Sequence, residues 1–214
     1  MGAIRYQIQQ ELWARDPVLA ESVGIKVVSA NNDAYAYVEA IAKHNWQKNM
    51  GYFGERSPIL LIGYSDGATC VRQFAFRLRK EYGTGMETID YVGMIDLVRE
   101  DIEGWPLSGD DQINMPPAYD AEHPYIMWGD NFYERTWAEY PLYVLPLWYV
   151  NGHEVAAHPT IHNFNMTVLE DGGHPDHVGI LDFKRIPEVR DTIAYYAAWS
   201  YVRSFSLLNK LYGA

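Results

Sequence analysis

The 214-residue sequence contains little cysteine and few basic residues. Its one cysteine, Cys70, excludes a disulfide bond within the chain. Lys and Arg number 17 against 28 Asp and Glu, which gives a formal charge of −11, and no basic run is present. Because clusters of Lys and Arg bind phosphate backbones, this charge balance argues against a nucleic-acid partner.

Long apolar runs and an export signal are also missing. The most apolar long stretch, residues 140–150, is too short to span a bilayer and contains Pro141 and Pro146. The N-terminus lacks the basic stretch and apolar core of a secretory signal. We therefore expect no transmembrane segment and a cytoplasmic location by default, with export left open. The length and an apolar content of 48% predict one domain over residues 1–214.

Helical and strand-like apolar patterns alternate along much of the chain. Helical spacing is seen at residues 4–15, 34–45 and 186–211. Short apolar runs typical of buried strands occur at residues 25–30, 58–63, 89–98 and 164–169. Strands that alternate with helices predict an α/β fold, with a mostly parallel sheet and helices on both of its faces.

Residues 99–163 have a different composition, with many Pro, Gly, Trp and Tyr residues and no clean period. Within this stretch, residues 124–128 are a candidate strand and residues 132–138 a candidate short helix. A long excursion of this kind inside a compact domain is usually a functional loop or lid. Its aromatic side chains could line an apolar pocket for an acyl or aryl group, or could form a small core of their own.

The most informative stretch is residues 58–70, where an apolar run ends in Gly-Tyr-Ser-Asp-Gly at 63–67 and a helical pattern follows at once. Strand, sharp turn and helix form the context of a nucleophile elbow. Any side chain in place of Gly63 or Gly67 is expected to collide with the neighbouring strand and helix. Ser65 is expected in a strained backbone, with its hydroxyl above the sheet edge. The pattern predicts a nucleophilic serine, and a glycine-rich packing turn is the alternative.

A serine hydroxyl needs a base that takes its proton and a carboxylate that orients the base. His177 lies in the turn-rich stretch 170–181, between the last expected strand and the closing helix. His174, three residues earlier, is the alternative base. Either imidazole could instead be an ordinary side chain of a surface loop.

Three carboxylates are candidates for the orienting acid. Asp96 ends the apolar run that follows the elbow helix, and Asp130 ends the next candidate strand. Glu154 is a weaker third candidate. A lone charge at the carboxyl end of a buried strand needs a partner or a function, and Asp96 ends the more convincing strand. A helix cap or a surface ion pair would be the structural alternative for Asp96.

The elbow, the strand-end aspartate and the loop histidine together resemble the α/β-hydrolase superfamily in its serine esterase and lipase branch. The resemblance covers roughly residues 25–210 and is that of a compact, N-terminally trimmed member. It implies a catalytic triad with Ser65 as nucleophile, His177 as base and Asp96 as acid, the last placed as in pancreatic-type lipases. Most members carry the acid one strand later, which would favour Asp130.

The resemblance also concerns the oxyanion hole. It implies that the backbone N–H of Asp66 is one donor, and a carboxylate at this position would be unhelpful unless it points away. Typical members have further strands before the first helix, and a loop there supplies the second donor. Only three residues precede the first expected helix here, so residues 29–33 are a candidate substitute. A missing leading strand would leave a sheet edge exposed, which makes a homodimer a candidate assembly.

These residues predict a serine hydrolase that cleaves carboxylic esters, of small-molecule or lipid-like type, through an acyl-enzyme and without a cofactor. Activity should fall at acid pH as the histidine base protonates, around pH 6 to 7. One alternative is a non-catalytic binding or structural module with the same fold. Another is a metal-dependent hydrolase that uses the His-rich stretch 153–177, because imidazole and carboxylate groups suit zinc.

Overall fold

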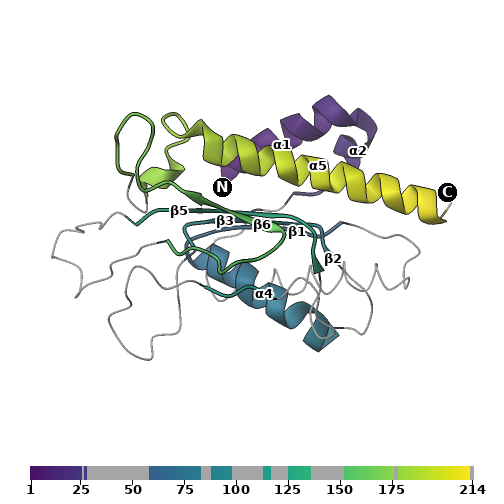
Figure 1. The fold of residues 1–214 in the computed structure, drawn as a ribbon. Coiled ribbons are helices and arrows are strands. Elements are labelled where there is room, and N and C mark those ends of the chain that lie inside the picture. The colour runs from purple at the N-terminus through teal and green to yellow at the C-terminus, as the bar shows by residue number, and fades with distance from the viewer. Residues whose placement is uncertain are drawn as a thin grey trace.

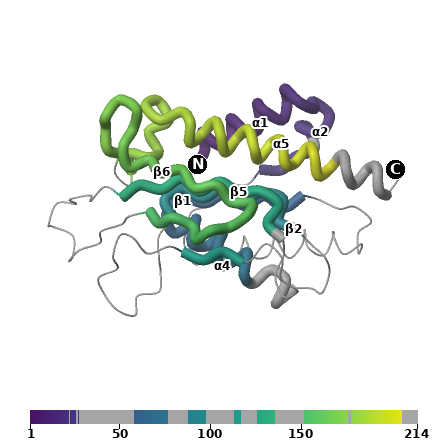
Figure 2. The backbone as a smooth tube through the Cα atoms, in the orientation of Figure 1, coloured from purple at the N-terminus to yellow at the C-terminus, as the bar shows by residue number. Residues whose placement is uncertain are grey.

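The computed structural model describes eight parts of the chain, which are residues 1–25, 27, 58–82, 88–97, 113–116, 125–135, 152–175 and 178–212. These parts form three layers, with helices on both faces of a parallel sheet (Figure 1). The tube drawing in Figure 2 shows the same layers. The expected α/β architecture is therefore confirmed at this level.

Four parallel strands make up the main sheet. In spatial order they are β1 (Leu60–Tyr64), β3 (Tyr91–Ile95), β5 (Gly129–Tyr133) and β6 (Ile161–Asn165). Two short strands, β2 (Thr88–Ile89) and β4 (Tyr125–Ile126), pair in parallel as a separate sheet. Because all four strands of the main sheet run the same way, their carboxyl ends lie along one edge.

Helices α1 (Gly2–Arg15), α2 (Pro17–Ser22) and α5 (Pro187–Tyr212) lie on one face of the main sheet, and α4 (Asp66–Tyr82) lies on the other (Figure 1). A short 3₁₀ helix, η1 (Gly179–Leu181), precedes α5. Pro17 begins a new helix, because the Asp16 side chain accepts the Leu19 N–H at 2.9 Å and caps α2.

Each face of the sheet has its own apolar core. On the α4 face, Phe74 packs with Val92 and Met94 of β3. On the opposite face, Ile193 of α5 belongs to a cluster with Tyr91 and Ile95 of β3 and with residues of α1. Strand β3 is buried along its whole length, which explains why its sequence is a continuous apolar run.

Several expected boundaries change in the structure. The helices expected at 4–15 and 186–211 are confirmed with small shifts. The expected strand at 89–98 is interrupted at Asp90, which separates β2 from β3 and accepts the Ile59 N–H at 2.8 Å on its carboxylate. The last strand is shifted toward the N-terminus, since β6 ends at Asn165.

The largest correction concerns residues 99–163. The candidate helix at 132–138 is wrong at its first two residues, which end β5. The candidate strand at 124–128 is limited to β4, which lies outside the main sheet. Since β5 lies between β3 and β6, this stretch contributes an internal strand and is more than a loop or lid. Most of the strand expected at 25–30, and all of the helix expected at 34–45, lie outside the described residues.

The turn between β1 and α4 depends on one of its two glycines. A Cβ atom at Gly63 would lie 2.1 Å from the carbonyl oxygen of Gly67, whereas a Cβ at Gly67 would meet nothing within 4 Å. The steric requirement that the sequence predicts is therefore present at Gly63 and absent at Gly67.

Gly63→Ala should lower the free energy of unfolding by about 3 kcal/mol, because backbone atoms of α4 would have to move. Gly67→Ala should change it by less than about 1 kcal/mol, since alanine is the better helix former. Urea denaturation of both variants measures the difference. Equal losses of stability would contradict this account of the turn.

Candidate functional site

Ser65 occupies the sharp junction between β1 and α4. Its φ of +55° is in the left-handed region, which Asp96 is the only other non-glycine residue in the described part of the chain to adopt. The Ser65 N–H donates to the Ile95 carbonyl oxygen at 3.0 Å, and the Ser65 carbonyl accepts the N–H of Ala68 at 2.8 Å. A non-glycine residue held in this region costs about 1 to 3 kcal/mol, and such strain is concentrated at functional sites.

Asp66 is the first residue of α4, where backbone N–H groups have no acceptor within the helix. Together with the helix dipole, these groups favour negative charge in front of the turn. The Asp66 side chain is exposed. The candidate second donor at residues 29–33 lies outside the described residues.

Asp96 directly follows β3 and is fully buried, with a φ of +54°. Its N–H donates to the Phe132 carbonyl at 2.7 Å, and its Oδ1 accepts the Glu134 N–H at 3.1 Å. The expectation that Asp96 ends a strand is confirmed, and its burial excludes a surface ion pair. Because the Ser65 N–H binds the residue before Asp96, the two positive-φ residues lie at adjacent strand ends.

A backbone segment at residues 152–154 crosses this edge of the sheet. The Gly152 N–H donates to the Glu134 carbonyl at 2.9 Å, and the His153 N–H donates to the Leu97 carbonyl at 2.8 Å. A Cβ atom at Gly152 would lie 1.9 Å from Asp96 Oδ1, so only glycine fits against this carboxylate. Sequence reasoning missed Gly152, because its role arises from contacts with distant parts of the chain.

Glu134 is the second buried residue that sequence reasoning missed. It follows β5 directly, is fully buried, and donates its N–H to Asp96. Two carboxyl-bearing side chains therefore lie buried at neighbouring strand ends. No local signal pointed to Glu134, because β5 has the sequence Gly-Asp-Asn-Phe-Tyr and the helix expected at 132–138 ran across its end.

Asp130 does not lie at the carboxyl edge. It is the second residue of β5, where it pairs with Gly93 of β3 and His162 of β6 in the middle of the sheet. The Tyr91 hydroxyl donates to Asp130 Oδ2 at 2.9 Å, and Asp130 Oδ1 lies 3.6 Å from His162 Nδ1. The interpretation of Asp130 as a strand-end residue is therefore wrong. The pairing of β5 with β3, and of β3 with β1, places Asp130 about three residues before the level of Ser65.

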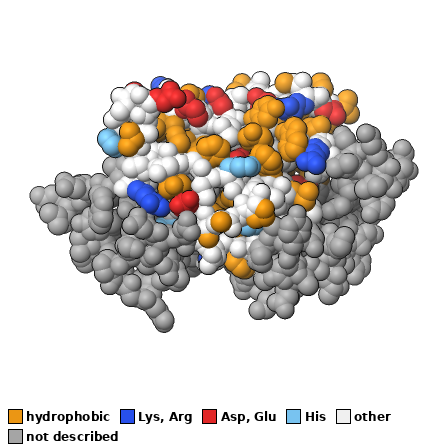
Figure 3. Space-filling view, in the orientation of Figure 1, with side chains coloured by type: hydrophobic (Ala, Val, Ile, Leu, Met, Phe, Trp, Pro, Cys, Tyr) orange, Lys and Arg blue, Asp and Glu red, His pale blue; other side chains and the backbone are white. Residues whose placement is uncertain are grey.

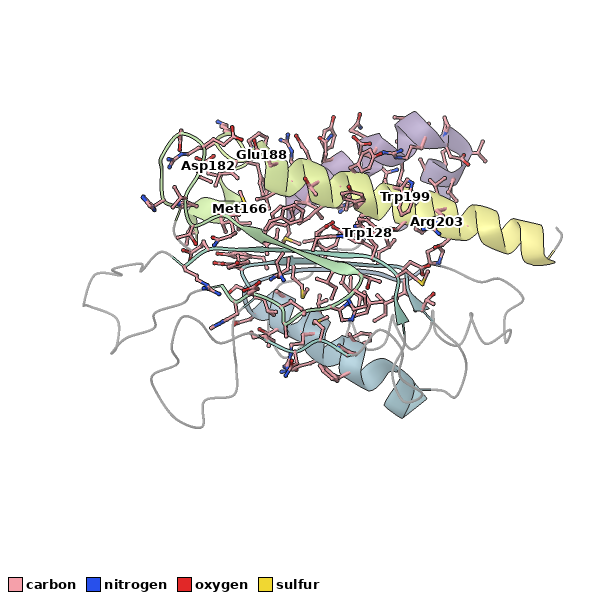
Figure 4. All side chains as sticks on the ribbon, viewed as in Figure 1. Trp128, Met166, Asp182, Glu188, Trp199 and Arg203 are labelled. Carbon is pink, nitrogen blue, oxygen red and sulfur yellow. The ribbon has the colours of Figure 1, made fainter. Side chains whose placement is uncertain are left out.

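Aromatic rings surround the Asp130–His162 pair on the α5 face. The ring centroid of Trp128 is 4.5 Å from that of His162 and 5.0 Å from that of Tyr196. Trp128 and Trp199 lie between the sheet and α5 in Figure 4. In Figure 3, hydrophobic side chains gather in the upper half of the side in view, at the level of α5. Burial raises the pKa of Asp130 from 3.8 to about 6, although the Tyr91 hydrogen bond and the His162 charge oppose this rise.

The two candidate bases differ in what the structure describes. His177 lies outside the described residues. His174 is exposed, with its Nδ1 2.9 Å from the Thr167 carbonyl oxygen. The loop that contains both histidines leaves β6 at the carboxyl edge, where the Arg135 N–H donates to Thr167 Oγ1 at 2.9 Å. The loop therefore begins on the same edge as Ser65 and Asp96.

The described part of the His-rich stretch does not form a metal site. His158 Nε2 lies 2.9 Å from the Pro116 carbonyl oxygen, and burial lowers the pKa of His158. Glu154, the third candidate acid, lies 3.6 Å from the Arg135 guanidinium. Within the ranges that the structure describes, no group of three or more His, Cys, Asp or Glu residues is arranged to hold a metal ion.

Comparisons with known proteins assign no family to this chain. No protein-family model matches it, and no curated protein or solved structure matches it either. In the described part of the chain, no helix is long and apolar enough to cross a membrane. A function must therefore be argued from the geometry of the site.

The buried Asp130 makes folding stability depend on pH. Its pKa of about 6 in the folded protein exceeds the usual 3.8, so the unfolded chain releases the proton first as pH rises. The stabilisation from the protonated carboxyl is thus complete below about pH 4 and is lost as pH rises through 6. A pKa rise of this size corresponds to about 3 kcal/mol.

Asp130→Asn should remove this contribution, so the variant should gain up to about 3 kcal/mol relative to wild type between pH 4 and pH 7. Urea denaturation across this range measures the gain. Tyr91→Phe is the matched control, because loss of the hydroxyl donor should move the wild-type midpoint upward. Parallel stability curves for wild type and Asp130→Asn would contradict the prediction.

Proposed function

We propose that this chain is a serine hydrolase of the α/β-hydrolase type that cleaves carboxylic esters through an acyl-enzyme on Ser65. One observation carries the proposal: Ser65 has a φ of +55° where a parallel strand turns sharply into α4, beside the buried Asp96. A strained serine between a strand and a helix is the arrangement that a nucleophile elbow needs.

The sheet topology supports this proposal. The parallel order β1-β3-β5-β6 brings four successive strand ends to one edge, and open α/β sheets bind ligands at this edge. Ser65 follows β1, Asp96 follows β3, and the histidine-bearing loop follows β6. Nucleophile, acid and histidine thus occur along the chain in the order typical of α/β-hydrolases.

The proposed reaction uses these groups in two steps. His177 accepts the Ser65 proton while Ser65 Oγ attacks the ester carbonyl, and the proton then passes to the leaving alcohol. Asp96 holds the imidazole in the required tautomer, and the Asp66 N–H donates to the tetrahedral oxyanion. Water then attacks the acyl-enzyme with His177 again as base, which releases the acid and restores Ser65.

Asp96 is the proposed acid in preference to Glu134 because of its strand. β3 lies directly beside β1, and β5 lies one strand farther away. Neighbouring strands are about 4.8 Å apart, so the backbone at the end of β5 lies roughly 10 Å from that of β1. The resemblance to α/β-hydrolases that carry the acid one strand later would, in this topology, point to Glu134 and not to Asp130.

Labelling with a fluorophosphonate, read out by intact mass, tests the nucleophile. We expect one adduct on wild type and none on Ser65→Ala, with a labelling rate that falls below about pH 6 to 7 if a histidine is the base. Ser200→Ala is the matched control, since it removes a buried hydroxyl on α5 that has no hydrogen-bond partner in the described part of the chain. A folded wild type without an adduct would contradict the proposal and favour a non-catalytic binding module.

The two buried carboxylates can be separated by isosteric changes. Asp96→Asn should slow labelling by about three to four orders of magnitude, as loss of the orienting acid does in other triads. Glu134→Gln should slow it by less than about tenfold. Second-order labelling rates and denaturation midpoints are measured for both variants. The reverse order of effects would assign the acid to Glu134.

A further inference from the structure

We propose that His162 is a second reactive centre of this chain, an imidazole that the buried Asp130 carboxylate makes nucleophilic and that accepts acyl groups from aryl esters. The inference is independent of the proposed serine hydrolase, because its residues take no part in the Ser65 reaction. Asp130 lies about three residues before the level of Ser65, which is roughly 10 Å along a strand. β6, which carries His162, is three strands away from β1.

A buried carboxylate with one unused oxygen lies behind the imidazole. The Asp130 side chain is fully buried. Its Oδ2 accepts the Tyr91 hydroxyl at 2.9 Å, whereas its Oδ1 accepts no hydrogen bond in the part of the chain that the structure describes. Burial of a carboxylate oxygen without a donor is costly, and folded proteins keep such groups mainly where they have a function. The unused oxygen is therefore the observation that points to a chemical role.

The imidazole of His162 lies next to this oxygen. Asp130 Oδ1 and His162 Nδ1 are 3.6 Å apart, which is slightly longer than a hydrogen bond. Contacts between catalytic groups are often long in a protein without substrate and shorten when the site is occupied. A small movement of the ring lets Nδ1–H donate to the carboxylate. This hydrogen bond fixes the proton on Nδ1 and leaves the lone pair on Nε2.

Asp130 carries its charge at mildly alkaline pH. Burial raises its pKa to about 6, so the carboxyl group is ionised at pH 8. Burial and the Asp130 charge raise the pKa of Tyr91 above its ordinary value, so the hydroxyl keeps its proton and donates to Oδ2. Oδ1 is thus left for the imidazole. An ionised acceptor forms a stronger hydrogen bond than a neutral one, and it stabilises the positive charge that develops on the ring during attack.

The imidazole is accessible, and aromatic rings lie beside it. The His162 side chain is 45% exposed. Its ring centroid lies 4.5 Å from that of Trp128, which in turn stacks on Tyr196 of α5 at 5.0 Å. The ring of Trp199 meets that of Trp128 edge-on at 6.1 Å (Figure 4). Aromatic side chains bind flat apolar groups, so these surroundings favour an ester with an aryl leaving group.

The proposed reaction has two steps. In the first, His162 Nε2 attacks the ester carbonyl carbon, the bond from this carbon to the aryl oxygen breaks, and the aryloxide leaves with the electron pair. The Nδ1 proton passes to Asp130, which leaves a neutral acyl-imidazole. In the second, Asp130 returns this proton to Nδ1 and water attacks the acyl carbon. The carboxylic acid and the free imidazole are released, and the other proton of the water goes to solvent.

His174 provides a matched comparison within the same molecule. It is exposed, and its Nδ1 lies 2.9 Å from the Thr167 carbonyl oxygen. Both imidazoles therefore have an oxygen acceptor near Nδ1, but only that of His162 is a carboxylate. The difference in reactivity between the two rings measures the effect of the Asp130 charge.

Carbethoxylation by diethyl pyrocarbonate at pH 8, read out for each histidine by peptide mapping, tests the nucleophile. We expect His162 to react about tenfold faster than His174 in wild type, a small part of what an orienting acid contributes in a full triad. In Asp130→Asn, which removes a buried charge and should remain folded, the two rates should become similar. Equal rates in wild type, or a rate at His162 that Asp130→Asn leaves unchanged, would overturn the proposal.

Hydrolysis of p-nitrophenyl acetate in a Ser65→Ala background, followed by the absorbance of released nitrophenol, tests turnover. We expect Ser65→Ala to retain a slow hydrolysis, and His162→Asn added to it to lower the remaining rate about tenfold. Because the serine is absent from both proteins, the result does not depend on the proposed function. An unchanged rate in the double variant would overturn the proposed acyl transfer through His162.

Discussion

The parallel pairing of β1 with β3 is the constraint on which the candidate site depends. Their register runs from Leu60 opposite Tyr91 to Tyr64 opposite Ile95, so both strands end at the same level. The Ser65 N–H continues the ladder to Ile95, and Ser65 and Asp96 then both turn away with positive φ. The backbone alone therefore brings the proposed nucleophile and the proposed acid to neighbouring strand ends.

This arrangement is costly, and the packing of both sheet faces offsets the cost. Two left-handed residues and the fully buried Asp96 all disfavour the folded state. Two apolar clusters stabilise the folded state and offset this cost. One lies under α4 and the other under α1 and α5, and both include residues of the buried strand β3. Asp96, the proposed acid, therefore directly follows a strand that is buried along its whole length between the two clusters.

Local patterns were sufficient to predict only part of this structure. The apolar run before Ser65, the helical spacing after it and the run ending at Asp96 each signal their element within a few residues. β5 could not be recognised in this way, because its buried residues include polar ones. Asn131 donates to the His153 carbonyl and to Asn163 Oδ1, both at 2.9 Å, and such partners are visible only after folding.

The same reasoning explains why a strand-end rule failed for Asp130 but succeeded for Asp96. Asp130 lies inside the sheet, where its partners are the Tyr91 hydroxyl and the His162 imidazole, and where burial raises its pKa. Asp96 lies where β3 ends. Its carboxylate accepts a hydrogen bond from the backbone N–H of Glu134, a group that can only donate. The proposed orienting acid must lie at the edge of the sheet where the proposed nucleophile lies. By register, Asp96 meets this requirement and Asp130 does not.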